Sequence, residues 1–383
     1  MKTVIIRGPA VTKSGYGRHC RDICRYFLNK PNVECKFILT PWGNTPWNLD
    51  KDEQDGLIGE IMDRSSAPDS RGDLSVQVQL PNEWSQDLAP TNIGVSAVVE
   101  TDRCHPMWVE SCNKMSRVIV PSKHVAATLT NTGNVTAPLH VVHESFTDAC
   151  MKDVKSLDVS LPPFTFLVFG QLTGANAATD RKNTFNTIKW LCETFADKED
   201  VGIVLKTNMG RNSKIDRTQT MNMLKSAIAE IRKGTFPRIT LLHGDMSDEE
   251  VVGLYKHPNV KALVSLTRGE GYGLPTCEAA ACGLPIIATG WSGHMDFLGV
   301  GKFINVGYTL QQIDPARVDN QIFVKEARWA DVHENDAKAK FMKFYQKSST
   351  PREWAKDLQV KVQEKFSFDS ICKQYDAVLG DLL

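Results

Sequence analysis

Short runs of β-branched and other apolar residues alternate along the chain with longer amphipathic stretches, which is the pattern of a parallel sheet with crossover helices. The run at 3–6 stops at Arg7-Gly8-Pro9, which predicts a buried strand that enters a loop. A helix is predicted from about 18 to 28. Further strands are predicted at 36–39, 76–80, 93–99 and 117–120, with a helix from Lys123.

A second alternation begins after Leu161-Pro162-Pro163, which reads as a linker. The fold class is therefore α/β, with two Rossmann-like domains over residues 1–160 and 161–345. Helices over 346–383 are expected to pack back on the N-terminal domain. Strands are predicted at 164–169, 201–205, 239–242, 262–266 and 285–288, and helices at 183–195, 218–233, 247–255, 276–282 and within 351–383.

Residues 41–75 are rich in Pro, Trp, Asn, Asp and Ser, which predicts irregular structure. A segment of that length without its own elements is uncommon in a compact domain and is often functional. Two interpretations stay open for it, a lid over a ligand site and a long solvated excursion.

Composition narrows the class of protein. Lys+Arg and Asp+Glu both total 45 in 383 residues, so no basic excess indicates a nucleic-acid partner. The ten cysteines form no C-x-x-C pair, which argues against a zinc site. The chain enters its first strand without a signal peptide, and no apolar run approaches the roughly 20 residues that span a bilayer. We expect a cytoplasmic protein with no membrane span.

The most informative run is 265–289, which reads as strand, glycine loop, helix, turn and strand. Gly271 and Gly273 permit close approach of a ligand to the backbone. The helix that opens at Leu274 offers free N–H groups to a diphosphate. Glu270 and Glu278 supply two carboxylates, which accept hydrogen bonds from the vicinal hydroxyls of sugars and riboses. The alternative is a generic turn followed by an incidental helix glutamate.

This run resembles the Glu-x7-Glu signature of the family 4 retaining glycosyltransferases, whose GT-B fold holds the donor in a cleft between two Rossmann-like domains. The resemblance implies that Glu270 binds donor-sugar hydroxyls and Glu278 the nucleotide ribose. It implies that the loop amides between them meet the sugar and phosphate. Those amides belong to Gly271, Tyr272, Gly273 and Leu274.

A second match to the family lies at Phe169-Gly170-Gln171 and Asp180–Asn183. Family members carry Gly-Arg and then Arg-Lys at these places, where the cations neutralise the donor diphosphate. Lys182 fits this role and Arg181 assists it, whereas Gln171 replaces the first arginine. Arg181 or Lys206 is expected to compensate. The alternative is an ordinary solvated basic start of a helix.

The N-terminal loop around Gly15 and Gly17 resembles the family's glycine loop, which faces the diphosphate, although half of such loops are ordinary turns. The third glycine of a dinucleotide fingerprint is replaced by Cys20, which argues against a nicotinamide oxidoreductase. Glu100 stands where the family often has a histidine near the reacting centre. Glu100 orients the acceptor or acts as a base, or it is a structural carboxylate.

The expected catalytic residues are Glu100, Asp102, Lys182 and Glu270, and whether Glu100 or His105 touches the acceptor stays open. The resemblance implies retention of configuration without an enzyme nucleophile. We expect no metal and no cofactor beyond the nucleoside-diphosphate sugar, which is the donor substrate.

The acceptor is less constrained. Residues 92–122 resemble short glycosyltransferases of large tailed phages, some of which act on hydroxymethylated bases of phage DNA. Arg18, Arg21 and Arg25 share one helix face, which either meets a phosphate backbone or is a solvated stripe. A glycan or small-molecule acceptor is the alternative. Two other functions stay open, an epimerase and a sugar-nucleotide-binding module without transfer. The sequence does not determine the donor's base, the donor's sugar or the oligomeric state.

Overall fold

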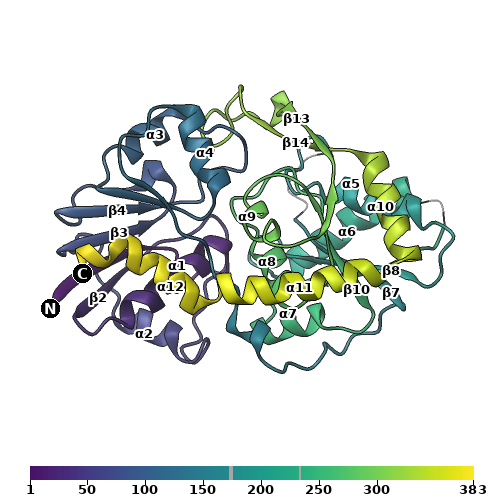
Figure 1. Cartoon of the computed structure of the whole chain (residues 1–383), viewed down its shortest axis with the longest axis horizontal. Coiled ribbons are helices and arrows are strands. Elements are labelled where there is room, and N and C mark those ends of the chain that lie inside the picture. Colours follow the sequence, from purple (N-terminus) through teal and green to yellow (C-terminus); the bar gives the residue numbers. More distant parts are fainter. Residues whose placement is uncertain (172–175, 233) are drawn as a thin grey trace. The chain divides into compact units, whose positions relative to one another are not determined.

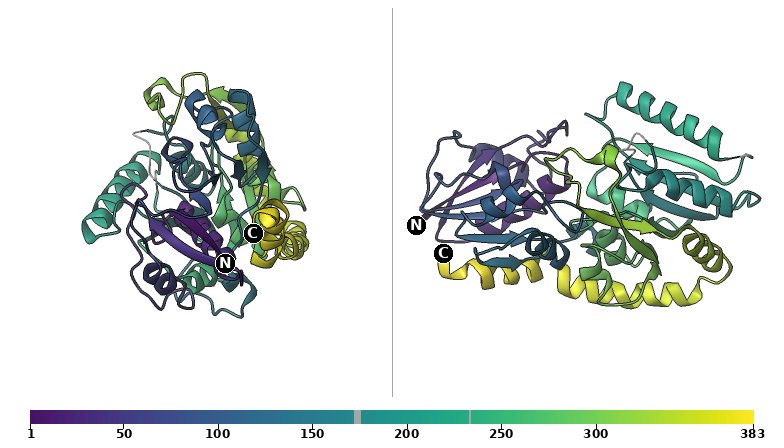
Figure 2. Two further views of the ribbon diagram at one scale, coloured as in Figure 1. Left: turned by 90° about the vertical axis from the view of Figure 1, so that its left-hand side faces the viewer. Right: turned by 90° about the horizontal axis from the view of Figure 1, so that it is seen from above.

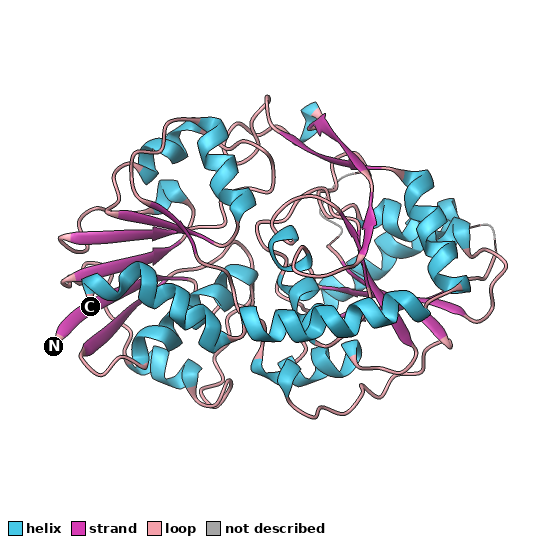
Figure 3. Cartoon of the chain, viewed as in Figure 1, coloured by secondary structure: helices cyan, strands magenta, loops and turns pink. Residues whose placement is uncertain are grey.

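The computed structural model describes residues 1–171, 176–232 and 234–383, and the chain forms two compact units. Each unit contains a six-stranded parallel sheet with helices packed against it (Figure 1, Figure 3). The first unit comprises Met1–Ser145, Asp319–Val324 and Phe368–Leu383, and the second comprises Phe146–Val318 and Lys325–Ser367.

The sheet of the first unit has the order β2-β1-β3-β4-β5-β6. Every residue of the central strand β3 is buried, as expected of a parallel sheet covered on both faces. The strands are β1 Lys2–Gly8, β2 Val33–Leu39, β3 Leu74–Val78, β4 Thr91–Val95, β5 Arg117–Val120 and β6 Leu139–Val141. The helices are α1 Gly15–Leu28, α2 Leu57–Asp63, α3 Pro106–Cys112, α4 Lys123–Thr132 and α12 Phe368–Leu379, with short 3-10 turns at Pro81–Glu83 and Gly380–Leu382.

The C-terminal helix α12 is part of the first unit and packs against α1. The Tyr26 hydroxyl donates to the Asp376 carboxylate at 2.8 Å. His19 Nε2 lies 3.1 Å from the Tyr375 hydroxyl, and both side chains are buried. Residues separated by more than 300 positions therefore share one core.

The sheet of the second unit has the order β12-β11-β10-β7-β8-β9. Its strands are β7 Phe164–Phe169, β8 Val201–Thr207, β9 Arg238–His243, β10 Val260–Ser265, β11 Ile286–Thr289 and β12 Ile304–Val306, and an antiparallel ribbon pairs β13 Tyr308–Gln312 with β14 Arg328–Val332. The helices are α5 Thr184–Thr194, α6 Lys214–Ile231, α7 Asp248–Tyr255, α8 Leu274–Ala281, α9 Met295–Leu298, α10 Glu334–Gln346 and α11 Ser349–Phe366, with 3-10 turns at Asp148–Met151 and Pro315–Arg317. Figure 2 shows the long α11 and α12 from two further sides.

Strand order in the second unit reverses at β7. The chain runs from β7 to β8 and β9 on one side, and then crosses to β10 on the other side of β7. Ligands of open parallel sheets bind at the carboxyl ends of the strands where the order reverses. The segments that leave these two strand ends carry Lys182 and Glu270.

Residues 41–75 and the strand predicted at 93–99 differ from the expected pattern. Residues 41–75 contain the helix α2 and the start of β3, so part of this stretch has regular structure. The strand predicted at 93–99 ends at Val95, because the backbone turns and Val98 adopts a φ of 54°. A β-branched residue in the left-handed region is strained, so the surrounding bonds hold this turn in place.

Candidate active site

The glycine loop after β10 ends at the start of α8. Gly273 has a φ of 101°, and a Cβ atom there would lie 3.2 Å from the Cβ of His294, so glycine is required. Pro275 stands in the first turn of α8 and has no N–H to offer. Within the described part of the chain, the amides of Gly273 and Leu274 make no hydrogen bond. These amides and the helix dipole favour an anion at this place.

Lys182 and Glu270 form an ion pair at the reversal point of the sheet. Lys182 Nζ lies 2.6 Å from Glu270 Oε1, and Arg181 Nη1 lies 3.8 Å from Glu270 Oε2. The carboxylate is only 12% exposed. Burial alone would raise the pKa of Glu270, but Lys182 and Arg181 outweigh it and hold that pKa below its usual range. This cluster therefore contains an ionised carboxylate and two cations.

Backbone bonds fix Arg181 against the glycine loop. Its guanidinium donates to the carbonyl of Gly269 at 2.9 Å, while its own carbonyl accepts from the amide of Arg268 at 2.9 Å. The buried Asp180 beside it accepts from the amide of Thr184 at 2.6 Å and so caps α5. The Asp180 carboxylate already occupies the N-terminus of α5. An anionic ligand therefore meets the side chains of Arg181 and Lys182 rather than the amides of α5.

Glu278 is oriented by Tyr255, the last residue of α7. The Tyr255 hydroxyl donates to Glu278 Oε2 at 3.3 Å. Burial and the nearby Glu278 charge raise the pKa of Tyr255, so this hydroxyl keeps its proton. The ring of Tyr255 packs on that of Phe169 at the end of β7, with centroids 5.6 Å apart. Glu278 is half-buried, with one oxygen bonded to Tyr255.

The loop after β11 holds the peptide of Glu270 from both sides. Its amide donates to the Ser292 hydroxyl at 2.9 Å, and its carbonyl accepts from the Gly293 amide at 2.9 Å. His294 Nε2 lies 2.6 Å from the carbonyl of Thr289, so Nε2 carries the proton and Nδ1, 3.4 Å from the Ser292 hydroxyl, is an acceptor. Burial lowers the pKa of His294 and keeps this arrangement neutral.

Sequence reasoning missed Tyr255, Ser292 and His294. The only local signal was the Gly-x-x-Gly spacing of Gly290 and Gly293 directly after a strand. A Cβ at Gly293 would fall 2.0 Å from the carbonyl oxygen of Gly271, so the two loops touch at a glycine.

Lys206 and Gln171 bond to groups outside the ion pair. The buried ammonium of Lys206 donates to the carbonyl of Gly244 at 2.6 Å, and burial lowers the pKa of Lys206. The exposed amide of Gln171 donates to Asn208 at 3.1 Å. Of the cations expected to compensate for Gln171, Arg181 is therefore the one beside Glu270.

Gly15 and Gly17 lie at the start of α1 in the first unit. The amide of Gly17 donates to the Ser14 hydroxyl, which caps the helix at 2.9 Å. A Cβ at Gly17 would fall 2.2 Å from the carbonyl oxygen of Thr12, whereas nothing lies within 4 Å of a Cβ at Gly15. Close packing thus requires glycine at position 17, and Gly15 faces open space.

Glu100 and Asp102 lie on the loop after β4, which Tyr16 anchors. The Tyr16 hydroxyl accepts from the amide of Ala97 at 2.9 Å and lies 3.0 Å from the Ser96 hydroxyl. Glu100 is half-buried and Asp102 is buried. The adjacent His105 accepts from the amide of Met107 through Nδ1 at 3.2 Å and so caps α3.

The arginines of α1 do not form a solvated stripe. Arg21 is buried and donates to two backbone carbonyls of the loop after β1, at 2.8 and 2.9 Å. Arg18 pairs with Asp22 at 3.4 Å, and the guanidinium of Arg25 lies 3.9 Å from the ring centroid of Phe368. These side chains have structural partners inside the first unit.

Within the described residues, no group of three or more His, Cys, Asp or Glu side chains is arranged to hold a metal ion. No helix in the same part of the chain combines the length and apolar character needed to cross a bilayer.

Residues 223–322 match the family model described as Glycosyl transferases group 1. This segment contains the glycine loop, Glu270, Glu278 and the loop with Ser292 and His294. The match confirms the enzyme class predicted from the sequence, a glycosyltransferase. No curated protein matches the chain in sequence.

Solved structures are similar in fold. Sucrose-phosphate synthase from Thermosynechococcus elongatus is 12% identical with a TM-score of 0.64, covering 100% of this chain and 99% of its own. HepE from Anabaena in complex with UDP-glucose is 13% identical with a TM-score of 0.57, covering 100% of both chains. A G117R mutant of TarM from S. aureus, in complex with UDP, fondaparinux and alpha-GlcNAc-glycerol, is 15% identical with a TM-score of 0.53, and the alignment covers 79% of this chain.

The match spans 54% of the length of TarM. At these identities the likeness concerns the fold. The two six-stranded parallel sheets with alternating helices are the Rossmann-like domains of the GT-B fold, as the sequence predicted.

Proposed function

We propose that this glycosyltransferase is a retaining enzyme that moves a sugar from a UDP-sugar to a hydroxyl acceptor. The observation that carries the proposal is the ion pair of Lys182 and Glu270 at the reversal point of a parallel sheet, beside the open N-terminus of α8. A cation, a carboxylate and free amides are the groups that a diphosphate-linked sugar needs.

Lys182 and Arg181 act on the diphosphate. Cleavage of the bond from sugar to phosphate leaves negative charge on the leaving diphosphate, and preorganised cations stabilise that charge as it develops. Lys182 exchanges its bond to Glu270 for one to a phosphate oxygen, and the amides of Gly273 and Leu274 add donors.

Glu270 and Glu278 act on hydroxyl groups. Once Lys182 turns to the diphosphate, Glu270 accepts hydrogen bonds from the donor sugar while Ser292 and Gly293 hold its peptide. Glu278 accepts from the ribose, with one oxygen kept in place by Tyr255. Two fixed carboxylates on one loop and helix orient the donor at two points.

Our assignments of the donor base and of the stereochemistry depend on similarity to other glycosyltransferases. HepE in complex with UDP-glucose and TarM in complex with UDP support a uridine nucleotide. Retention follows from the resemblance to the family 4 enzymes. In that mechanism the leaving diphosphate takes the acceptor proton on the face where the new bond forms, so neither an enzyme nucleophile nor a metal takes part. Glu100 and Asp102 are the carboxylates that we assign to acceptor orientation.

The hypothesis that the acceptor is a hydroxymethylated base in DNA is supported only by the resemblance to phage glycosyltransferases. The arginine face of α1 that would meet a phosphate backbone is engaged within the first unit. A glycan or small-molecule hydroxyl is therefore the acceptor class that we favour.

The test incubates the full chain with UDP-glucose, UDP-galactose and UDP-N-acetylglucosamine, and with glycans, plain DNA or hydroxymethylcytosine DNA. Mass spectrometry detects transfer, and proton NMR reports the anomeric configuration of the product. Lys182→Met is expected to weaken UDP binding about 10- to 100-fold, because a charge-assisted bond contributes about 1.5–3 kcal/mol. Lys338→Met, which removes an ion-paired lysine of α10, is the control.

An inverted product would contradict the retaining assignment. UDP binding without transfer to any acceptor would favour a sugar-nucleotide-binding module, and altered donor without acceptor would favour an epimerase.

A further inference from the structure

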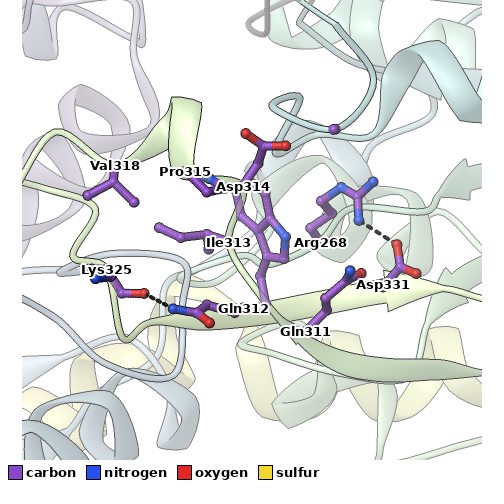
Figure 4. Close-up of a pocket in the computed structure, with 11 residues that line it drawn as sticks. Arg268, Gln311, Gln312, Ile313, Asp314, Pro315, Val318, Lys325 and Asp331 are labelled. Atoms are coloured by element: carbon purple, nitrogen blue, oxygen red, sulfur yellow. Dashed lines mark hydrogen bonds and ion pairs between the residues drawn. The ribbon is translucent and has the colours of Figure 1, made fainter.

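A pocket of about 710 Å³ lies beside the β13–β14 ribbon in the second unit (Figure 4). Arg268 Nη1 pairs with Asp331 at 2.8 Å, and the side chain of Gln312 donates to the carbonyl of Lys325 at 2.6 Å. These polar groups bond to one another and indicate no ligand. The cysteines at the end of α8 are different, because their thiols can react.

Cys150 and Cys282 meet at the carbonyl oxygen of Glu278. Cys282 follows the last residue of α8, and its amide donates to that oxygen at 2.9 Å. The Cys150 thiol, from the 3-10 turn at Asp148–Met151, donates to the same oxygen at 3.7 Å. The Cys282 thiol is also a hydrogen-bond partner of the Cys150 thiol, and this bond together with burial raises the pKa of Cys150. Two thiols in contact need little movement to form a disulfide.

Solvent access distinguishes this pair from the other cysteines, all ten of which lie in the described part of the chain. Cys282 and Cys372 are partly exposed, whereas the other eight are buried. Cys20 and Cys24 are also hydrogen-bond partners, but both are fully buried within α1. Cys282 therefore combines an accessible thiol with a neighbouring thiol.

The turn that carries Cys150 packs against both α7 and α8. At the start of this turn, the Thr147 hydroxyl donates to the Asp248 carboxylate of α7 at 2.7 Å. Tyr255, the last residue of α7, donates to the Glu278 carboxylate. A covalent bond from this turn to the end of α8 therefore acts on the helix that carries Glu278 and on the helix that orients its carboxylate.

We propose that Cys150 and Cys282 are a redox-active pair, which a peroxide joins in a disulfide that constrains the last turn of α8 and so displaces Glu278. The peroxide first oxidises the accessible Cys282 thiol to a sulfenic acid, and the O–O bond breaks with release of water. The Cys150 sulfur then attacks the Cys282 sulfur, the S–O bond breaks, and the hydroxyl group leaves with the Cys150 proton as a second water. The two thiols lose two electrons, and one peroxide is reduced to two waters.

The disulfide removes the hydrogen that Cys150 donates to the Glu278 carbonyl, and it draws the end of α8 toward the 3-10 turn. The effect on nucleotide binding rests on the proposed function, in which Glu278 accepts from the ribose. The oxidised chain is expected to bind UDP at least about threefold more weakly than the reduced chain. Formation of the disulfide does not depend on that function.

The experiment treats the full chain with a small excess of hydrogen peroxide, alkylates the remaining thiols and maps the cross-linked peptides by mass spectrometry. Calorimetry with UDP compares the reduced chain, the oxidised chain and the oxidised chain after dithiothreitol. We expect a link between Cys150 and Cys282, the loss of UDP affinity given above, and recovery of that affinity after dithiothreitol.

Two variants and a control assign the effect to this pair. Cys282→Ser and Cys150→Ser should each form no link, and each should keep its UDP affinity within about twofold after peroxide treatment. Cys372→Ser, which removes the other partly exposed thiol, is the matched control and should lose affinity as the wild-type chain does.

Free thiols at both positions after peroxide treatment overturn the proposal, as does a link that includes the buried Cys277. Equal UDP affinities of the linked and reduced chains, or irreversible oxidation of Cys282 alone, overturn it as well. A reduced chain that does not bind UDP would instead contradict the proposed function. The disulfide map, recorded without nucleotide, would still decide whether the pair is redox-active.

Discussion

Lys182 Nζ and Glu270 Oε1 lie 2.6 Å apart and neutralise each other. The cation expected to hold the diphosphate and the carboxylate expected to hold the sugar are thus each other's partners until a donor arrives. When the ion pair opens, each side chain needs another charged or hydrogen-bonding partner. A complete donor supplies both replacements, whereas a bare nucleoside diphosphate supplies only one and leaves Glu270 without Lys182.

Glu270→Gln is expected to improve the affinity for UDP and to reduce sugar transfer. Lys182 no longer has to leave a carboxylate, so UDP should bind about 3- to 10-fold more tightly, while turnover should fall at least about tenfold because the sugar hydroxyls meet a weaker, uncharged amide oxygen in place of a carboxylate. Calorimetry with UDP and initial rates with UDP-sugar measure the two effects.

The control is Glu334→Gln, which breaks the exposed pair of Glu334 and Lys338 on α10 and should change neither quantity. A Glu270→Gln chain that binds UDP more weakly than the wild type would contradict the competition between ligand and ion pair.

Tyr255→Phe is expected to lower UDP affinity about 3- to 10-fold, because only part of the about 1.5–3 kcal/mol of a hydrogen bond to a carboxylate is lost while α8 still holds Glu278 in place. The loss arises because Glu278 is no longer oriented toward the ribose. Tyr345→Phe removes a hydroxyl that donates to Asp200, on the surface of the same unit, and serves as the control in the same calorimetric titration. Equal affinities for the two variants would remove Tyr255 from the site.

Ser292→Ala and Ser292→Gly separate the hydroxyl from the backbone strain. Ser292 has a φ of 88°, which glycine adopts freely and alanine does not, so the glycine variant should be more stable than the alanine variant by about 1 kcal/mol. Both lose the acceptor for the amide of Glu270. Turnover should therefore fall in both, with UDP affinity within about twofold of wild type.

Thermal unfolding and steady-state kinetics measure these outcomes. Full turnover in either variant would show that the Ser292 hydroxyl does not position Glu270.

Stability of the first unit is expected to decrease in acid because of His19. Burial lowers the pKa of His19 from 6.5 to about 4, although Glu144 at 3.6 Å favours its protonation. Between these values the unfolded chain binds the additional proton. Stability is thus fully present above about pH 6.5 and is lost toward about pH 4, by on the order of 3 kcal/mol.

Urea unfolding at several pH values measures this slope. His19→Gln should flatten it, whereas His333→Gln, at an exposed position in the second unit, should retain it. An unchanged slope in His19→Gln would assign the acid sensitivity to another group.

Sequence patterns predicted the structure most reliably where a single short segment contains all the residues that determine its conformation. The strand, glycine loop and helix around Glu270 and Glu278 lie where the 265–289 run predicted them, because strand propensity, glycine and a helix-starting proline agree there. The strand at 164–169 was likewise predicted to the residue.

The rest depends on contacts between segments far apart in the chain. Tyr255 reaches Glu278 across 23 positions and Ser292 reaches the Glu270 amide across 22, and neither has a periodic signature. The β13–β14 ribbon was missed because its strands are joined by a long connection rather than a tight turn. Arg21 was expected on an outward face, toward a phosphate backbone or solvent, because helical spacing does not reveal which backbone carbonyls the helix covers.

The position of α12 in the first unit affects how the protein forms during synthesis. Residues 1–145 emerge first, yet the helix that covers His19 and Tyr26 is made only after the entire second unit. Until α12 has left the ribosome, all strands of the first sheet have been synthesised, but the helix that packs against α1 is still missing. A nascent chain therefore exposes the apolar face of α1 throughout most of its translation, which makes this face a natural binding site for chaperones.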